Sequence, residues 1–490
     1  MLQGRGANLC GGYVMGGPIE SALIEQCRRL IATPSVTTEG TRAVAELCAR
    51  EILGPAGIDA QTVASPRHGP SQVNLRAQVP GADPSLPPLV LSTHLDTVSP
   101  GDPALWTECG GDPFNPTAAG DRLYGLGAAD VKPDFLVKAM ALAATPTPRR
   151  TVYLIGTFGE ERGLLGAKEL ADSGTLPPGG LAFVGEPSGL AVISSHKGLA
   201  VFDLAIGFEP VREHAPLAPA RLAVIGRAAH SSTPHLGDNA IVRALERLVQ
   251  CPGAGVVSIR GGDAVNKVPA RCEVTLAGAV AAQKFLSAVK NAIAVEMSPS
   301  DRVAEDGTLI PPAALALLAQ FVRELDGFAA NAGPPEPDYA PPTLTCNPAV
   351  LRSEAGGLRL QFELRLPPRL ALGELRQGLY QLADTFADSA LRSGFRWSLH
   401  EERANPAFRA NVEGAALAAA MEALGRCGLP RRTAIKMGCT EAGVYAAAGL
   451  DPVVFGPGPS IGVIHAPNEY AVISELAAAL NFYRELLVRA

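Results

Sequence analysis

The feature that most constrains this chain is a series of short apolar runs that alternate with helical stretches. The run "PPLVLST" precedes "VKPDFLVKAMALAAT", "RRTVYLIGTF" precedes "RGLLGAKELADSG", and "LAFVGE" follows. Strands that are apolar along their whole length are buried on both faces, as in a parallel sheet covered by helices on both sides. The sequence therefore predicts an α/β domain with a mostly parallel sheet flanked by helices.

The pattern changes between residues 200 and 404. Segments such as "ARLAVIG", "ARCEVTLAGAV" and "GGLRLQFELRLPP" alternate imperfectly between apolar and polar residues, as antiparallel strands with one solvated face do. We therefore expect one α/β domain formed by 18–199 and 405–490, with a smaller α+β domain inserted at 200–404. The Gly-rich residues 1–17 are expected to be a disordered lead-in, and the Pro-rich stretch at about 298–343 to be an insertion.

Composition and charge exclude several classes of protein. The chain of 490 residues is 47% hydrophobic and 18% charged, with a formal net charge of −6 and no Lys/Arg run. Nucleic acid and anionic membranes are therefore not expected partners. Nine scattered cysteines without a CxxC spacing are typical of reduced thiols in a cytoplasmic protein. No apolar stretch reaches the roughly 18 residues that a membrane span needs.

Acidic and imidazole side chains follow the ends of the predicted strands. They are His94 and Asp96 in "STHLDTV", Asp130 in "GLGAADVKP", Glu160 and Glu161 in "GTFGEERGLL", Glu186 in "VGEPS", and His465 in "GVIHAPNEY". Ligands of such sheets bind beyond the carboxyl ends of the strands. Neighbouring carboxylates are costly to bury unless a cation compensates for their charge. Two imidazoles with several carboxylates fit a pair of divalent metal ions, with zinc the first choice, for co-catalytic hydrolysis of an amide.

Each of these residues taken alone has a simpler explanation. The pair Glu160–Glu161 is favoured at a helix start, and Asp130 can cap the helix that follows it. His196 in "SHKG" is interpreted as a core residue. His230 precedes two serines, but no G-x-S-x-G elbow supports a serine hydrolase, and Cys439 has no His nearby in the sequence. The metal site is favoured because its residues occur together.

Eight segments occur in an order that resembles a known family. They are "HLDTV", "GLGAADVKP", "GEERGLLGAK", "GEPS", "HKG", "AAHSSTPHLGDNAI", "GGDAVNKVP" and "FGPG…HAPNEY". The chain resembles, from about residue 18 onward, the dizinc metallopeptidase family of acetylornithine deacetylase, succinyl-diaminopimelate desuccinylase, aminoacylase and glutamate carboxypeptidase. The resemblance implies a zinc-peptidase-like catalytic domain and an inserted domain that serves as a lid and in dimerisation.

The resemblance also implies a role for each residue at the strand ends. The implied zinc ligands are His94 and Glu186 for one ion, Glu161 and His465 for the other, and Asp130 as the bridge between them. The resemblance implies that Glu160 is the general base and proton shuttle. Asp96 is expected to hold the imidazole of His94.

Four further positions match family residues that contact the substrate. The resemblance implies that His230 reaches the active site of the partner subunit and polarises the scissile carbonyl. Asn266, Arg365 and Gly458 are expected to contact the substrate, with Arg365 as a clamp for its carboxylate. The positions that depart from the family pattern, none of them a ligand, are Leu126, Pro133 and Gly159.

The sequence thus predicts a metal-dependent amidohydrolase that removes the acyl group from an N-acyl amino acid through a metal-bridging water, as acetylornithine deacetylase does. A dipeptidase or carboxypeptidase of the same family is the alternative within this class. A catalytically inactive metal-binding scaffold is the alternative in another class. Two Zn²⁺ ions are expected, with Co²⁺ or Mn²⁺ as substitutes. We also expect a small-molecule substrate (an N-acyl amino acid or a short peptide), a homodimer formed through the inserted domain, and a cytoplasmic location.

Overall fold

The chain divides into two compact units. The computed structural model describes residues 18–212, 220–277, 285, 295–299 and 308–490. Unit 1 comprises the chain up to Ser194 together with Ala410–Ala434 and Thr440–Ala490, and unit 2 comprises Ser195–Arg409 and Ile435–Cys439. The expected lead-in at 1–17 lies outside the described residues. The catalytic role assigned to 18–199 with 405–490, and the lid role assigned to 200–404, remain predictions.

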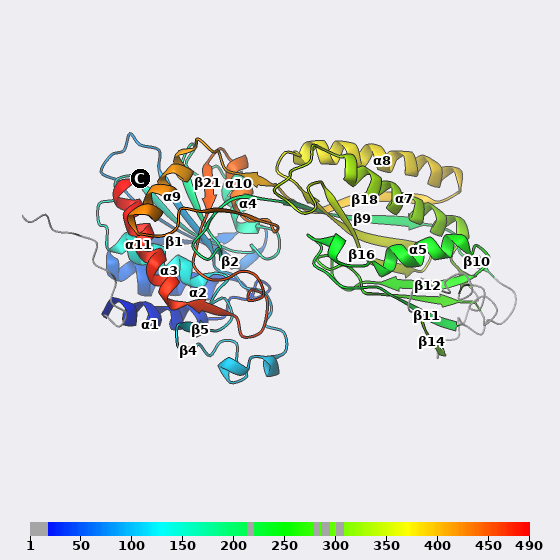
Figure 1. The fold of residues 1–490 in the computed structure, drawn as a ribbon, viewed down its shortest axis with the longest axis horizontal. Coiled ribbons are helices and arrows are strands. Elements are labelled where there is room, and N and C mark those ends of the chain that lie inside the picture. Colours follow the sequence, from blue (N-terminus) through cyan, green and yellow to red (C-terminus); the bar gives the residue numbers. More distant parts are fainter. Residues whose placement is uncertain (1–17, 213–219, 278–284, 286–294, 300–307) are drawn as a thin grey trace, which may run out of the picture. The chain divides into compact units, whose positions relative to one another are not determined.

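Unit 1 is built on a mixed sheet with helices packed on it (Figure 1). Its strands are β1 (Ala60–Ser65), β2 (Gly69–Val79), β3 (Leu89–His94), β4 (Thr117–Ala119), β5 (Arg122–Tyr124), β6 (Val152–Thr157), β7 (Leu181–Gly185), β8 (Val192–His196), β21 (Asp451–Val454) and β22 (Tyr470–Val472). Its helices are α1 (Pro18–Ala32), α2 (Arg42–Leu47), α3 (Lys132–Ala143), α4 (Leu165–Asp172), α9 (Ala415–Arg426), α10 (Ala442–Ala447) and α11 (Ile473–Arg489). Strand β20 (Thr433–Lys436) pairs with β8.

The parallel strands lie at the centre of this sheet. The strand order is β1-β2-β6-β3-β7-β21-β8, in which β6, β3, β7 and β21 are parallel and the outer pairings are antiparallel. Every residue of β3 and β7 is buried, because helices cover both faces. The register sets His94 opposite Thr157 and Thr93 opposite Gly185. Three strands therefore end level with one another, so the residues that follow them converge at one edge. The predicted α/β fold class is confirmed.

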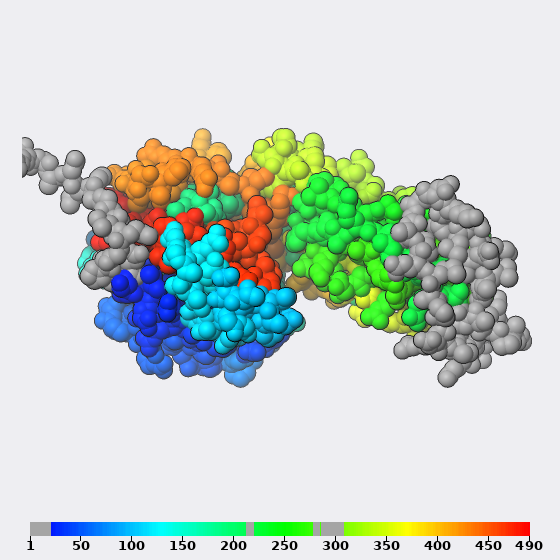
Figure 2. Space-filling view, turned by 60° about the horizontal axis from the view of Figure 1, so that its bottom comes forward, coloured from blue at the N-terminus to red at the C-terminus, as the bar shows by residue number. Residues whose placement is uncertain are grey.

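A separate small sheet brings two distant segments together on the surface of unit 1. Strand β5 pairs with β22, and the backbone N–H of Glu108 donates to the side chain of Asn468. Figure 2 shows the segment 103–125 (cyan) beside the segment 455–472 (red-orange). This pairing fixes the loop that precedes β22. None of the helices within the described residues combines the length and the apolar character needed to cross a membrane.

Unit 2 is an antiparallel sheet with long helices packed on it (Figure 1). Its strands are β9 (Gly198–Gly207), β10 (Val211–Arg212), β11 (Ala220–Ile225), β12 (Val256–Gly261), β13 (Arg271–Leu276), β14 (Val295–Pro299), β15 (Thr308–Leu309), β16 (Thr345–Glu354), β17 (Gly357–Leu366), β18 (Arg396–Asn405) and β19 (Phe408–Arg409). Its helices are α5 (Ala240–Gln250), α7 (Pro312–Asn331) and α8 (Leu372–Arg392). The α+β character predicted for 200–404 is present.

The large sheet of unit 2 consists of two similar halves. Its strand order is β14-β11-β13-β12-β16-β17-β9-β18. The outer half runs β9-α7-β16-β17-α8-β18, which is a split βαβ arrangement. The inserted half runs β11-α5-β12-β13 and returns to β14, with residues 278–284 and 286–294 outside the described residues. When the strands of each half are numbered in chain order, the inserted half has the spatial order 4-1-3-2 and the outer half the order 2-3-1-4. The second order is the reverse of the first, so a pseudo-two-fold axis between β12 and β16 relates the two halves.

The stretch at about 298–343, expected to be an insertion, contains a long helix, α7. Between two Pro-rich segments, residues 312–331 form a helix of 20 residues. Leu318, Phe321 and Leu325 of this helix are buried in the core of unit 2. The prolines stand at the first turn and beyond the end of the helix, where proline is tolerated. The segment is therefore part of the folded core of unit 2.

Candidate metal centre

The candidate site lies at the carboxyl ends of the parallel strands of unit 1. His94 is the last residue of β3, Glu160 and Glu161 follow β6, and Glu186 follows β7. The remaining two predicted ligands stand on loops: Asp130 precedes α3, and His465 precedes β22. Parallel strands that end at the same level place these residues at one edge, where α/β proteins bind ligands.

Asp130 lies between two imidazoles. Its Oδ1 is 3.0 Å from Nε2 of His94, and its Oδ2 is 3.3 Å from Nε2 of His465. Nε2 of His465 is also 3.0 Å from Oε1 of Glu161. One ligand atom from each of Asp130, Glu161 and His465 lies within 4.8 Å of the other two. A carboxylate whose two oxygens face different imidazoles has the geometry of a bridge between two metal ions.

The electrostatics of the site favour added positive charge. Burial raises the pKa of Glu160 well above its usual value, and the charge of Glu186 raises it further. Burial also raises the pKa of Glu161. Burial lowers the pKa of His465, but hydrogen bonds to Asp130 and Glu161 raise it to about 11. In the metal-free protein, bound protons thus compensate the negative charge of the carboxylates. Divalent cations can take the place of these protons at the N and O donors. The residues fit a metal centre.

Asp96 orients the ring of His94 through its main chain and supports the turn of the two glutamates through its side chain. Nδ1 of His94 donates to the backbone carbonyl of Asp96 at 3.0 Å, whereas Oδ1 of Asp96 lies 3.7 Å away. The carboxylate instead accepts hydrogen bonds from the backbone N–H groups of Glu160 (3.1 Å) and Glu161 (3.3 Å) and from the hydroxyl of Thr37 (2.8 Å). The main chain of Asp96 thus orients the ring of His94, leaving Nε2 to bind metal, and its side chain fixes the turn that carries the two glutamates.

Glu469 is a buried acid that the sequence prediction missed. Its Oε1 accepts hydrogen bonds from the backbone N–H groups of Ala129 (2.8 Å) and Asp130 (3.0 Å). Burial raises its pKa to about 8, and the charge of Asp130 contributes to the shift. Glu469 therefore ties the loop of Asp130 to the segment that carries His465. Its only signal in the sequence is its place in "HAPNEY", four residues after a predicted ligand.

Glu441 is a second buried acid without a predicted role. It stands at the start of α10, is 1% exposed, and accepts a hydrogen bond from the hydroxyl of Ser92 at 3.3 Å. Burial raises its pKa to about 7. Because Ser92 lies on β3 two residues before His94, Glu441 supports the strand that carries this ligand. Its sequence context, "GCTEAG", does not distinguish it from a surface acid.

The "GPG" segment brings the main chain close to Glu186. A Cβ atom on Gly456 would lie 2.5 Å from the carbonyl oxygen of Glu186, so only glycine fits there. Gly458 has φ +92°, its N–H donates to Glu475, and its carbonyl accepts from Gly189. Gly458 thus braces this loop within the protein, and its contact with substrate stays a prediction.

The predicted substrate residues of unit 2 form a group of their own. His230 and Asn266 are exposed, and the backbone of Ser231 donates to the carbonyl of Asn266 at 3.0 Å. Arg365 is 6% exposed and paired with Glu363 at 2.6 Å, and its NH2 group lies 3.4 Å from Oγ of Ser231. Unit 2 therefore brings the loops of His230 and Asn266 together beside Arg365 of β17.

Comparison with known proteins identifies the family. The model of peptidase family M20/M25/M40 matches residues 90–489. The chain belongs to this family. It is similar to an acetylornithine deacetylase of Klebsiella pneumoniae, with 31% identity over 280 residues that cover 51% of this chain and 66% of the relative. An acetylornithine deacetylase of Proteus mirabilis is 32% identical over 281 residues, covering 51% of this chain and 65% of the relative. The matches thus span a little under two thirds of the curated relatives.

Two solved structures share the fold over nearly the whole chain. An aminoacylhistidine dipeptidase from Vibrio alginolyticus has a TM-score of 0.63 at 17% identity, covering 95% of this chain and 96% of its own. A dinuclear metal-binding peptidase of the M20 family from Bacillus subtilis has a TM-score of 0.51 at 13% identity, covering 96% and 97%. The predicted family resemblance is confirmed.

Proposed function

We propose that this chain is a metal-dependent amidohydrolase that removes the acyl group from an N-acyl amino acid. The observation that carries the proposal is the position of Asp130, whose two carboxylate oxygens face the imidazoles of His94 and His465. Membership of a peptidase family and similarity to acetylornithine deacetylases support amide hydrolysis and a deacylase branch.

The proposed cofactor is a pair of Zn²⁺ ions, for which Co²⁺ or Mn²⁺ can substitute. His94 and Glu186 would hold one ion, Glu161 and His465 the other, and Asp130 both. Imidazole and carboxylate donors are the set that catalytic zinc prefers. When bound, such a pair supplies Lewis acidity that polarises an amide carbonyl and acidifies a water molecule.

The protein side chains would handle the protons and the substrate. Glu160 is proposed to accept a proton from water at a carboxylate oxygen and to deliver it to the leaving nitrogen. The turn that carries Glu160 is held by the carboxylate of Asp96. His230 is proposed to donate a hydrogen bond to the scissile carbonyl in the site of a partner subunit. The backbone N–H of Ser232 donates to Nδ1 of His230 at 3.1 Å, so the neutral ring carries its proton on Nε2 and presents a donor there.

A panel of substrates tests the proposal. Zinc-loaded full-length protein is assayed with acetyl, succinyl and formyl amino acids and with dipeptides, while its metal content is measured by mass spectrometry. Two metal ions per chain with turnover of N-acyl amino acids are expected. If only dipeptides are hydrolysed, the chain is a peptidase and the proposed deacylase activity is wrong. Two bound metal ions without any turnover would indicate a scaffold and overturn the proposal.

A further inference from the structure

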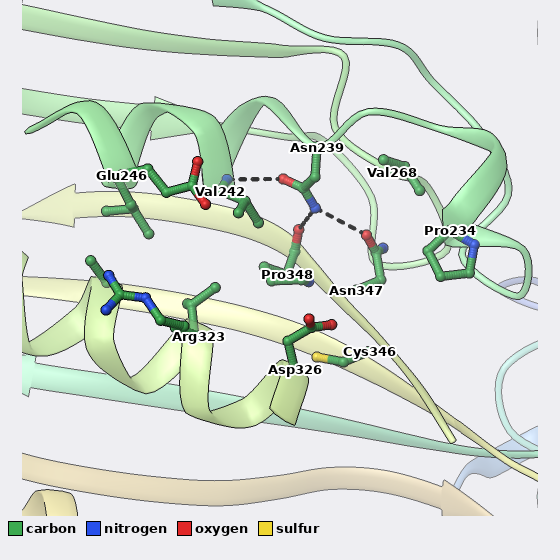
Figure 3. Close-up of a pocket in the computed structure, with 13 residues that line it drawn as sticks. Pro234, Asn239, Val242, Glu246, Val268, Arg323, Asp326, Cys346, Asn347 and Pro348 are labelled. Carbon is green, nitrogen blue, oxygen red and sulfur yellow. Dashed lines mark hydrogen bonds between the residues drawn. The ribbon is translucent and has the colours of Figure 1, made fainter. Parts of the chain in front are cut away.

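A cavity lies within unit 2, and none of its lining residues is one of those assigned to the reaction. It has a volume of about 240 Å³ and lies between α5 and α7, with residues of β16 in its lining (Figure 3). Sites for drug-sized ligands are larger, about 300–1,000 Å³. At about 30 Å³ per water molecule in the liquid, the cavity offers the space of roughly eight waters. Its size therefore suits a molecule as small as a single amino acid.

Three charged side chains from the two helices border this cavity. Glu246 extends from α5, and Arg323 and Asp326 extend from α7 (Figure 3). Val242 and Val322 contribute apolar wall. Within the part of the chain that the structure describes, none of the three charged groups forms an ion pair. The cavity therefore offers one cationic and two anionic groups to a ligand.

Two asparagines connect the cavity to the His230 loop. Nδ2 of Asn239 donates to Oδ1 of Asn347 at 3.2 Å and to the carbonyl of Pro348 at 2.8 Å (Figure 3). Nδ2 of Asn347 donates in turn to the carbonyl of Lys267 at 2.8 Å. Lys267 forms a β-bridge with His230. A ligand that orders these asparagines therefore acts on the backbone that holds His230.

The cavity also lies at the junction of the two halves of unit 2. Helix α5 belongs to the inserted half, and α7 and β16 belong to the outer half. The sheet joins the halves through two residue pairs, Arg260 with Arg352 and Gly261 with Leu351, whereas β16 pairs with β17 along nearly its whole length. Helices α5 and α7 both contribute buried residues to one hydrophobic core that spans the two halves, so a ligand between these helices would add contacts to both halves and bias their relative position.

We propose that this cavity is a regulatory binding site for a free amino acid with a cationic side chain. The ligand carboxylate would pair with Arg323, and its two ammonium groups with Glu246 and Asp326. One carboxylate and two ammonium groups are the complement of the charges that line the cavity. Bound there, the ligand would stabilise the arrangement of the two halves and change the position of the His230 loop. The binding step is independent of the proposed reaction, and only the effect on turnover rests on the proposed function.

Calorimetric titration of zinc-loaded full-length protein with L-lysine tests the binding step. One binding site per chain is expected. L-norleucine, which lacks the side-chain ammonium group, and 1,5-diaminopentane, which lacks the carboxylate, should each bind at least tenfold more weakly than L-lysine. R323A and D326N should each weaken binding at least tenfold. Both residues are exposed, so these changes leave the core intact. The matched control is E324Q, also exposed on α7 and outside the cavity lining, which should bind as the wild type does.

A second variant separates the cavity from the catalytic centre. Glu160→Ala should bind L-lysine as tightly as the wild type if the ligand occupies unit 2. Absence of binding at millimolar L-lysine, or equal binding by R323A and D326N, would overturn the proposal. So would loss of binding in Glu160→Ala alone, because the ligand would then occupy the catalytic centre.

The regulatory effect has its own measurement. L-lysine should change kcat/KM for an N-acetyl amino acid at least twofold in the wild type and leave R323A unchanged. An equal change in R323A would contradict the regulatory role, and so would an unchanged rate in the wild type when calorimetry shows binding. If the chain hydrolyses no N-acyl amino acid, the proposed function fails, whereas the titration still decides whether the cavity binds its ligand.

Discussion

Most candidate residues of unit 1 are buried and most of those of unit 2 are exposed, with His465 (45% exposed) and Arg365 (6% exposed) as exceptions. In unit 1, His94, Asp130 and Glu186 are buried at the ends of strands or helices, and buried groups such as Asp96 and Glu469 fix the backbone around them. In unit 2, His230 and Asn266 stand exposed on loops whose main support is other loops. Rigid placement suits metal ligands, which tolerate little displacement. Exposed loops suit a residue that must reach a separate surface.

The largest expected effect is on the proton shuttle of unit 1. Glu160→Ala should reduce turnover at least about 10²-fold, because general acid–base catalysis contributes about 10²–10⁴, and should leave the metal content unchanged. The exposed Asp172 of α4 provides the matched control, since Asp172→Ala should leave both quantities unaltered. Unchanged turnover in Glu160→Ala would remove this residue from the mechanism.

His230 tests whether unit 2 serves catalysis without touching the metal centre. His230→Ala should lower kcat about 10²–10³-fold, the usual cost of losing one donor to a developing oxyanion, with two metal ions still bound. Mixing His230→Ala with Glu160→Ala subunits should restore activity if the imidazole acts across a homodimer. A mixture that remains inactive although the subunits exchange would assign His230 to the site of its own chain.

A smaller effect is expected for the acid that positions Asp130. Glu469→Leu keeps the approximate size of the side chain but removes the acceptor for the N–H groups of Ala129 and Asp130. Metal affinity, measured by competition with a chelator, should fall roughly 10–100-fold, as for other residues that support a metal ligand. Retained metal affinity in Glu469→Leu would mean that the loop of Asp130 keeps its position without the hydrogen bonds to Glu469.

The smallest effect concerns the stability of the metal-free protein. Burial raises the pKa of Glu441 to about 7, whereas the group titrates near about 4.3 in an unfolded chain. The folded state therefore binds the extra proton, and the stability that it contributes is complete below about pH 4.3 and is lost, by roughly 3 kcal/mol, as the pH rises to about 7. Denaturant titrations should show Glu441→Gln gaining on the wild type from pH 5 to pH 8. A pH-independent difference in unfolding free energy between Glu441→Gln and the wild type would contradict the raised pKa.

Much of unit 1 could be predicted from the sequence. The runs "PPLVLST" and "LAFVGE" indicated fully buried strands, and the structure buries every residue of β3 and β7. The predicted ligands His94, Asp130, Glu161 and His465 do meet. Residues that follow parallel strands are recognisable because chain direction alone brings them to one edge.

The misses share a physical cause. Glu469 and Glu441 resemble surface acids, since their burial depends on segments hundreds of residues away. The ring of His94 is oriented by a hydrogen bond to the backbone carbonyl of Asp96. Every residue has such a carbonyl, so the sequence cannot indicate this interaction. Helix α7 lies between Pro-rich segments that conceal it in the sequence, because proline is typical of loops although it is also suited to a helix start.

The sequence by itself determined which segments are buried strands, which residues carry metal-binding chemistry, and to which family the chain belongs, because apolar runs and residue order report local preferences directly. Only the tertiary structure decided that Asp130 faces two imidazoles, that Asp96 supports the glutamate turn with its side chain, and that unit 2 joins two similar halves around a charged cavity. These arrangements depend on contacts between residues far apart in the chain, whose geometry is set by packing and strand pairing rather than by any local pattern.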